Sequence, residues 1–223
     1  MVIGATGAVG SALVRELLAS PRCAGVTIVT RRAAGMFANA PGAAKLTQRL
    51  MDMDRLELSA RESAAGCEVA FCTMGIGQPR KVSREEFWKV DVEYAGAFAR
   101  ACKAAGVRHM SLLTSVGANP TSRAYYLRAK GSVEAAYRGL GFERLSCFHP
   151  CLLVTRETRY GLQDRLTQLL FPRVSRFLPS RFHEIRVEDL GRAMRLNAER
   201  DGSGVEVLHY AECLALLRFA ERL

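Results

Sequence analysis

Three residues in the middle of the chain have the types and the spacing of a proton-transfer site. Tyr126 and Lys130 are four positions apart, so on a helix they share one face. A tyrosine alone titrates too high to exchange protons readily at neutral pH, and a lysine ammonium one turn away lowers the tyrosine pKa. Ser115 precedes them at the end of an apolar run and would hold a substrate oxygen against the tyrosine hydroxyl. Such a set suits hydride transfer, in which alkoxide charge develops on a carbonyl oxygen.

A glycine-rich turn at the start of the chain is the second group of residues that could have a chemical function, in this case ligand binding. Gly4, Gly7 and Gly10 follow the apolar residues 1–3 and lead into residues 11–19, whose leucines recur with helical spacing. A strand, a glycine turn and a helix N-terminus form an anion site, because helix N–H groups point outward and glycines admit a pyrophosphate. The alternative is an ordinary strand–helix turn. We predict dinucleotide binding by Gly4, Thr6, Gly7, Ala8, Val9 and Gly10.

The residues after the second predicted strand indicate which dinucleotide is bound. Residues 25–30 are a short β-branched run that ends at Arg31 and Arg32, and no acidic residue lies between Glu16 and Asp52. In dinucleotide folds an acidic residue at this point holds the 2′-hydroxyl of NAD, whereas an arginine accommodates the 2′-phosphate of NADP. The two arginines therefore favour NADP(H) over NAD(H), although charge at a strand end is also common on protein surfaces.

Further cofactor contacts are expected where later strands end. Asp52 follows a predicted strand over residues 45–51 and would either accept a hydrogen bond from the adenine amino group or cap a helix. The strand over residues 67–72 runs into small residues, which let a ligand lie over the backbone. The remaining predicted cofactor contacts are Met53, Thr73, Met74, Gly75, Thr114, Lys130, Pro150 and Cys151.

The elements that must position these residues alternate between strand and helix. A long helix is expected over residues 83–105, followed by strands over 109–114 and 143–148. This alternation predicts an α/β fold with a doubly wound parallel sheet. We expect a single domain over residues 1–223, with the cofactor-binding core in 1–150 and a small irregular substrate or lid region in 151–223.

Composition limits the other classes of function. The chain is 49% hydrophobic and carries a net charge of +10, but its arginines are scattered without dense runs, which fits a phosphate-rich cofactor and argues against nucleic acid. No apolar stretch is long enough to cross a membrane. Seven cysteines without zinc-ligand spacing predict no metal site and reduced thiols, and hence a cytoplasmic protein.

The motifs together resemble the short-chain dehydrogenase/reductase family. The glycine spacing matches its extended or atypical pattern, and Ser115, Tyr126 and Lys130 match its catalytic set. Residues 71–75, 112–119, 126–134 and 148–150 are similar to the atypical subgroup that includes the Tat-interactive-protein-like oxidoreductases. The resemblance implies a Rossmann domain that binds NADP(H), with Tyr126 as proton donor or acceptor and Lys130 on the nicotinamide ribose. It also implies that the region after residue 151 binds the substrate.

Two positions depart from the family pattern. Pro150 is followed by Cys151, where relatives often have Pro-Gly. The asparagine that completes a catalytic tetrad in many relatives has no clear counterpart, and Asp91 or Glu93 lies in that region. His149, beside the expected site, would be either a proton relay or a loop histidine with a structural role.

Three functions follow from these residues. The first is an NADP(H)-dependent oxidoreductase that acts on a small, apolar or carbonyl-bearing substrate. The second is an NADPH-sensing regulatory or partner-binding protein with little catalysis. The third is a peripheral membrane or quinone-linked module, suggested by the Leu, Phe and Arg residues of 159–182.

Overall fold

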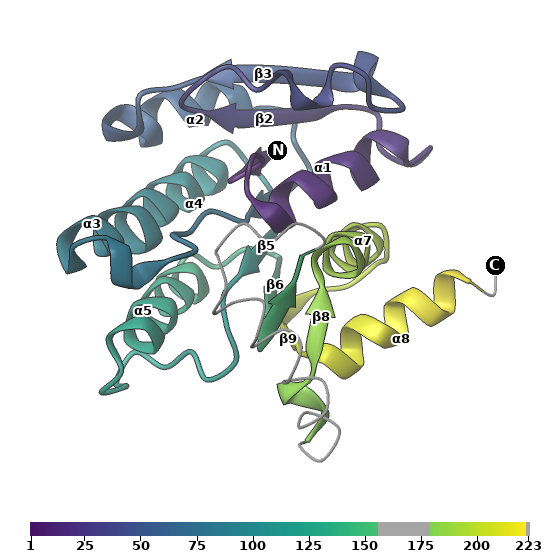
Figure 1. Ribbon diagram of the computed structural model, residues 1–223. Helices are drawn as coiled ribbons and strands as arrows, with labels where there is room; N and C mark the ends of the chain where they lie inside the picture. The colour runs from purple at the N-terminus through teal and green to yellow at the C-terminus, as the bar shows by residue number, and fades with distance from the viewer. Residues whose placement is uncertain (156–178, 222–223) are drawn as a thin grey trace.

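Seven parallel strands form the centre of the computed structural model, which describes residues 1–155 and 179–221 (Figure 1). The chain starts in the middle of the sheet, adds strands outward on one side and then returns to the other side, so its direction reverses between β1 and β4. In spatial order the strands are β3 (Leu46–Leu50), β2 (Val26–Thr30), β1 (Val2–Ile3), β4 (Val69–Cys72), β5 (His109–Leu113), β6 (Arg144–Phe148) and β9 (Gly204–Leu208). In sheets of this kind, ligands bind at the carboxyl ends of the strands beside such a reversal.

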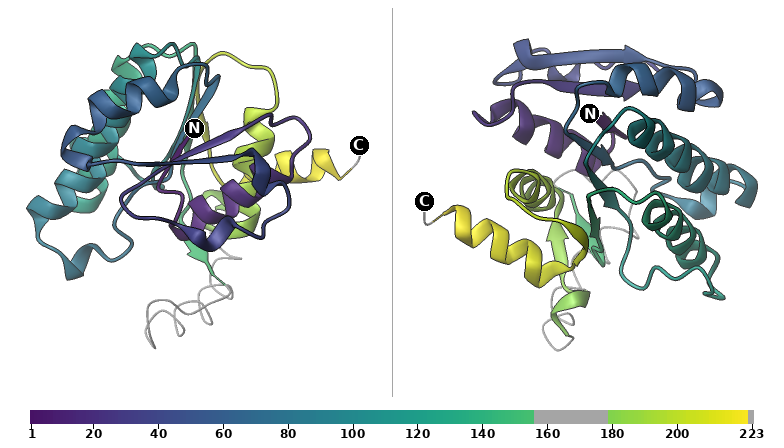
Figure 2. Two further views of the ribbon diagram at one scale, coloured as in Figure 1. Left: turned by 90° about the horizontal axis from the view of Figure 1, so that it is seen from above. Right: turned by 180° about the vertical axis from the view of Figure 1, so that it is seen from behind.

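Helices cover both faces of the sheet, as Figure 2 shows. One face carries α1 (Ala8–Ala19), α7 (Val187–Ala198) and α8 (Tyr210–Ala220). The other carries α2 (Leu56–Ala64), α3 (Arg84–Trp88), α4 (Ala95–Ala104) and α5 (Tyr125–Gly139). This is the doubly wound α/β arrangement that the alternation of strands and helices predicted.

The alternation of side chains along each strand divides the core into two layers. Val2 and Ile28 are buried beneath α1 and α7, whereas their neighbours Ile3 and Val29 are buried beneath α2 and α4. Successive strand residues point to opposite faces, so a strand covered on both sides must be apolar throughout. This explains the continuous apolar runs from which the strands were predicted.

The described part of the chain after residue 151 contributes a strand and a helix to the core. β9 pairs with β6 in the main sheet, and α7 packs closely against α1. Two short strands, β7 (Leu152–Val154) and β8 (Glu184–Arg186), form a separate parallel pair. Most of residues 159–182, which suggested a membrane module, lie outside the described residues.

The helix expected over residues 83–105 is not regular. Between α3 and α4 the residues Lys89–Tyr94 form a π-helical turn. A π turn inserts an extra residue, which rotates the side chains that follow relative to those before. Asp91 is thereby directed into the interior, where only 1% of its surface is exposed.

Candidate functional site

The turn between β1 and α1 lies tightly against the end of β4. Gly4 has a positive φ of 81°, and a Cβ there would lie 2.5 Å from the Thr73 carbonyl carbon. A Cβ on Gly10 would lie 2.1 Å from the Gly4 carbonyl oxygen. These contacts are closer than real Cβ atoms make, so the first and third glycines are required by the packing of the turn itself.

Gly7, the middle glycine, has a different environment. Its added Cβ would meet only the Gly4 carbonyl oxygen, at 3.2 Å. Gly7 is the N-cap of α1 in extended conformation, no side chain caps the helix, and its first turn holds no acidic residue. The N–H groups of Ala8 and Val9 therefore face outward at the positive end of the helix dipole. The residues present fit the pyrophosphate of a dinucleotide.

Arg31 and Arg32 follow β2, which is paired directly with β1. Both side chains are exposed, and neither has an ion-pair partner within residues 1–155 and 179–221. Their guanidinium groups are therefore available to a phosphate. Their role in binding the 2′-phosphate of NADP stays a prediction.

Asp52 and Thr73 have structural partners in addition to their predicted roles. The Asp52 carboxylate accepts a hydrogen bond from the Asp54 N–H at 3.0 Å and caps a short helix, as the alternative prediction stated. The Thr73 hydroxyl donates to the Ile3 carbonyl at 3.0 Å and so joins the ends of β4 and β1. Met53 is buried, and Met74 packs against the same core layer. Thr6 is exposed at the turn.

Tyr126 and Lys130 lie on one face of α5, as their spacing predicted. The Lys130 ammonium is 5.8 Å from the centre of the Tyr126 ring. Ser115 is buried two residues after the end of β5, and its hydroxyl donates to the Val116 carbonyl at 3.3 Å. The loop that follows Ser115 is fastened to α5 by a 3.0 Å hydrogen bond from the Asn119 N–H to the Leu127 carbonyl.

An acidic partner of Lys130 was not assigned from the sequence. The Asp91 carboxylate lies 2.7 Å from the Lys130 nitrogen, and both side chains are almost completely buried. The other carboxylate oxygen accepts a hydrogen bond from the Ile76 N–H at 2.8 Å. Burial alone would lower the pKa of Lys130, but the charges of Asp91 and Tyr126 raise it above its ordinary value.

A second buried cluster lies one turn further along α5. Glu134 bonds the His149 ring at 2.6 Å and the Arg138 guanidinium at 2.6 Å, and Thr114 donates to it at 3.4 Å. Burial raises the pKa of Glu134, but its hydrogen bonds to His149 and Arg138 outweigh burial and hold it below the ordinary value. This pairing agrees with the structural role for His149. The sequence did not predict the Glu134–His149 pair, because the two residues come from a helix and a strand end that are adjacent only in the folded chain.

Pro150 and Cys151 lie on the strand end beside Ser115. The Pro150 carbonyl accepts a hydrogen bond from the Val116 N–H at 3.0 Å. Burial raises the pKa of the Cys151 thiol, so this thiol remains protonated at neutral pH.

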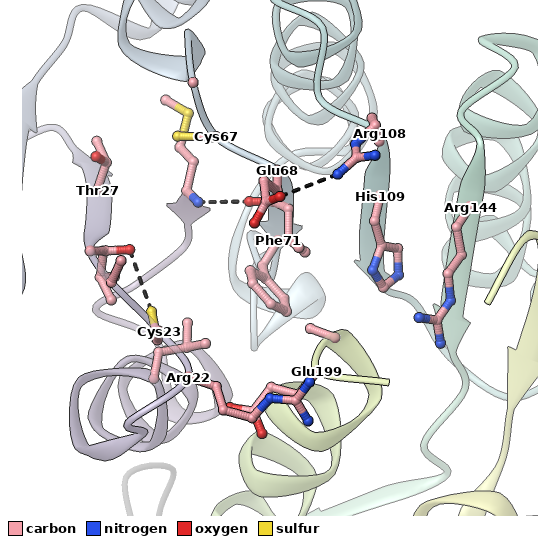
Figure 3. Close-up of a pocket in the computed structure, with 18 of the residues that line it drawn as sticks. Arg22, Cys23, Thr27, Cys67, Glu68, Phe71, Arg108, His109, Arg144 and Glu199 are labelled. Atoms are coloured by element: carbon pink, nitrogen blue, oxygen red, sulfur yellow. Dashed lines mark hydrogen bonds and ion pairs between the residues drawn. The ribbon is translucent and has the colours of Figure 1, made fainter. Parts of the chain in front are cut away.

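A cavity of about 700 Å³ lies at the opposite edge of the sheet (Figure 3). Its walls include Thr27, Glu68, His109 and Arg144, which lie at or just before the amino ends of their strands. β1 has only two residues there, so Val26 of β2 and Val69 of β4 have no β1 residue between them. This cavity is separate from the glycine turn and the Ser115, Tyr126 and Lys130 group at the carboxyl edge.

Comparison with known proteins identifies the family of this chain. A family model described as NAD(P)H-binding matches residues 4–142, which include the glycine turn, Ser115, Tyr126 and Lys130. The chain belongs to this NAD(P)H-binding family. Protein HTATIP2 of Rattus norvegicus is 35% identical over 162 residues, which cover 72% of this chain and 65% of the rat protein. The mitochondrial protein FMP52 of Candida albicans is 30% identical over 76% of this chain and 73% of its own length.

Solved structures similar to this member of the NAD(P)H-binding family confirm its fold. MoeE5 in complex with UDP-glucuronic acid and NAD superposes with a TM-score of 0.72 at 20% identity, over 94% of this chain and 75% of that one. The Citrobacter sp. triphenylmethane reductase complexed with NADP(H) has a TM-score of 0.62 at 14% identity, over 93% and 68% of the two chains. These structures show that the chain has a Rossmann fold. Together with the family match and the rat relative, this fold supports the resemblance to atypical short-chain dehydrogenase/reductase proteins.

The predicted cytoplasmic location is wrong on these comparisons. The fungal relatives of this family member, from Candida albicans, Aspergillus fumigatus and Debaryomyces hansenii, are named as mitochondrial proteins. The prediction rested on reduced cysteines, and all seven are indeed free thiols. Free thiols argue against an oxidising compartment but do not distinguish one reducing compartment from another.

Two other kinds of site are absent from the described ranges, 1–155 and 179–221. These ranges contain no helix long and apolar enough to cross a membrane. They also contain no group of three or more His, Cys, Asp or Glu side chains placed to hold a metal ion.

Proposed function

We propose that this chain is an NADP(H)-dependent oxidoreductase that transfers hydride to or from a small carbonyl or alcohol. The observation that carries the proposal is the position of the Lys130 ammonium, 5.8 Å from the Tyr126 ring and on the same helix face. Both residues lie at the carboxyl edge of the sheet, where the glycine turn also lies. A bound nicotinamide would supply or accept the hydride.

Tyr126 would act as the general acid or base. In the reducing direction its hydroxyl donates a proton to the carbonyl oxygen as negative charge develops there, and in the oxidising direction it accepts the alcohol proton. The neighbouring Lys130 ammonium stabilises the phenolate that the donation leaves. Ser115 would hold the substrate oxygen in place for this transfer, since its loop is packed against α5.

The preference for NADP(H) rests on Arg31 and Arg32. They lie after the strand paired with β1 and have no ion-pair partner in the described part of the chain. A 2′-phosphate would accept charge-assisted hydrogen bonds from them, which the 2′-hydroxyl of NAD(H) cannot match.

A pair of tyrosine variants tests the role of Tyr126. Purified protein would be screened with NADPH against aldehydes, ketones and quinones, and the accepted substrate used to compare Tyr126→Phe with Tyr125→Phe. Loss of the general acid is expected to lower kcat by about 10²- to 10⁴-fold in Tyr126→Phe. Tyr125 is the matched control, because its hydroxyl bonds the Arg84 carbonyl and lies outside the proposed chemistry. Equal turnover by wild type and Tyr126→Phe would reject the proposal.

A further inference from the structure

A buried carboxylate joins two parts of the candidate site. Asp91 lies in the π-helical turn, and its side chain is fully enclosed. One oxygen is 2.7 Å from the Lys130 nitrogen on α5, and the other accepts the Ile76 N–H at 2.8 Å. Ile76 belongs to the loop after β4, which also carries the predicted cofactor contacts Thr73 and Gly75.

Gly75 shows how closely these groups are packed. A Cβ there would lie 3.0 Å from an Asp91 oxygen and 3.1 Å from the Lys130 nitrogen. Glycine therefore lets the loop backbone approach the ion pair directly. The loop after β4, the carboxylate and the lysine form one contiguous group.

Among residues 1–155 and 179–221, Asp91 is the carboxylate that pairs with the Lys130 ammonium. The groups that face its ammonium are Asp91 from the π-helical turn, Tyr126 from its own helix and the Cys72 thiol from β4. Burial raises the pKa of Cys72, so this thiol is neutral at physiological pH. The Asp91 carboxylate, 2.7 Å from the ammonium, is thus placed to offset the cost of burying the lysine charge.

We propose that Asp91 is a positioning residue that keeps Lys130 charged and fixes it against the loop after β4. The proposal rests on the proposed function, in which Lys130 stabilises the Tyr126 phenolate and contacts the bound cofactor. The Asp91 carboxylate lies 2.7 Å from the buried ammonium, and an uncharged amide in its place could not neutralise the lysine. The carboxylate therefore gives this chain a directly paired lysine whose charge is set by residue 91.

The pH dependence of NADPH binding tests this role. Wild type, Asp91→Asn and Asp54→Asn would be titrated with NADPH by nicotinamide fluorescence from about pH 7 to about pH 9.5. The amide of Asp91→Asn would leave the buried ammonium without a counter-charge, so Lys130 should lose its proton within this range. We expect the Kd of Asp91→Asn to rise about tenfold or more with pH, as a charge-assisted contact is lost. Wild type should change less than about twofold.

Asp54→Asn is the matched control, because Asp54 forms an exposed ion pair with Lys89 at 2.8 Å near the same turn. The Kd of Asp54→Asn for NADPH should change with pH as little as that of wild type. Asp91→Glu is the second variant, which keeps the charge and should restore a flat profile even where Asp91→Asn folds poorly. Failure of wild type to bind NADPH would reject the proposed function. Binding by wild type together with a flat profile in Asp91→Asn, or a sloping profile in Asp91→Glu, would reject the role of Asp91 alone.

Discussion

Gly131 of α5 is in direct contact with the backbone of Asn119, so that a Cβ on Gly131 would lie 2.2 Å from the Asn119 carbonyl carbon. This contact presses the loop that begins at Ser115 against the helix that carries Tyr126 and Lys130. The geometry of the candidate catalytic set thus depends on a residue without a side chain. Gly131 follows Lys130 directly in α5. The residue spacing gave no sign that the loop backbone packs against this particular glycine.

Substitution of Gly131 by alanine is expected to displace this loop. An overpacked contact of this kind costs about 1–3 kcal/mol of unfolding free energy, which outweighs the helix-propensity gain of alanine. Turnover should fall because Ser115 moves, whereas NADPH binding at the glycine turn should be kept. Gly139→Ala is the control, since a Cβ there meets nothing within 4 Å. Equal stability of Gly131→Ala and wild type in urea unfolding would contradict the packing argument.

The middle and last glycines of the turn should respond differently to alanine. Gly10→Ala places a Cβ 2.1 Å from the Gly4 carbonyl oxygen and should destabilise the whole fold. Gly7→Ala makes a contact of only 3.2 Å, so it should fold and lose nucleotide affinity, because its methyl group enters the anion site. Thermal unfolding and NADPH titration of both variants separate the two effects. A Gly7→Ala protein that binds as tightly as wild type would place the nucleotide elsewhere.

His109 should make stability depend on pH between about 4 and about 6.5. Burial and the nearby Arg144 charge lower the pKa of His109 to about 4, and its ring bonds the Ser146 hydroxyl at 2.8 Å. The folded protein therefore favours the neutral ring. Its contribution is complete above the unfolded pKa of about 6.5 and is lost as the pH falls toward 4, with a size of about 3 kcal/mol.

The His109→Gln variant tests this linkage. Its unfolding free energy should decrease less than that of wild type between pH 6.5 and pH 4, because glutamine does not titrate. Denaturant unfolding at several pH values measures the difference. Parallel pH profiles for the two proteins would show that His109 is protonated equally in the folded and unfolded states.

Much of the fold could be predicted because buried parallel strands leave a simple pattern. Residues 25–30, 67–72 and 109–114 are apolar runs between turn residues, and each corresponds to a strand of the sheet. The glycine spacing located the β1–α1 turn for the same reason, since only glycine permits contacts such as that of Gly4 with Thr73. These signals come from residues that are neighbours in the chain, so a single sequence is enough to detect them.

The features that were missed depend on contacts between distant segments. A regular helical period over residues 83–105 gives no sign of the π turn, so the inward direction of Asp91 could not be predicted. The Glu134 and His149 pair joins residues that are adjacent only when α5 packs beside the end of β6. β7 is a three-residue strand, too short for a periodic pattern to identify.

The most direct test of the account is nucleotide binding by wild type and by the Arg31→Ala/Arg32→Ala variant. Nicotinamide fluorescence would be followed during titration with NADPH and with NADH, with Arg218→Ala as an exposed control on α8. We predict that wild type binds NADPH more tightly than NADH and that the double variant loses roughly 10- to 100-fold in NADPH affinity, the value of charge-assisted phosphate contacts. NADH binding should be unchanged. Absence of binding by either nucleotide would contradict the account and leave the glycine turn as a structural element only.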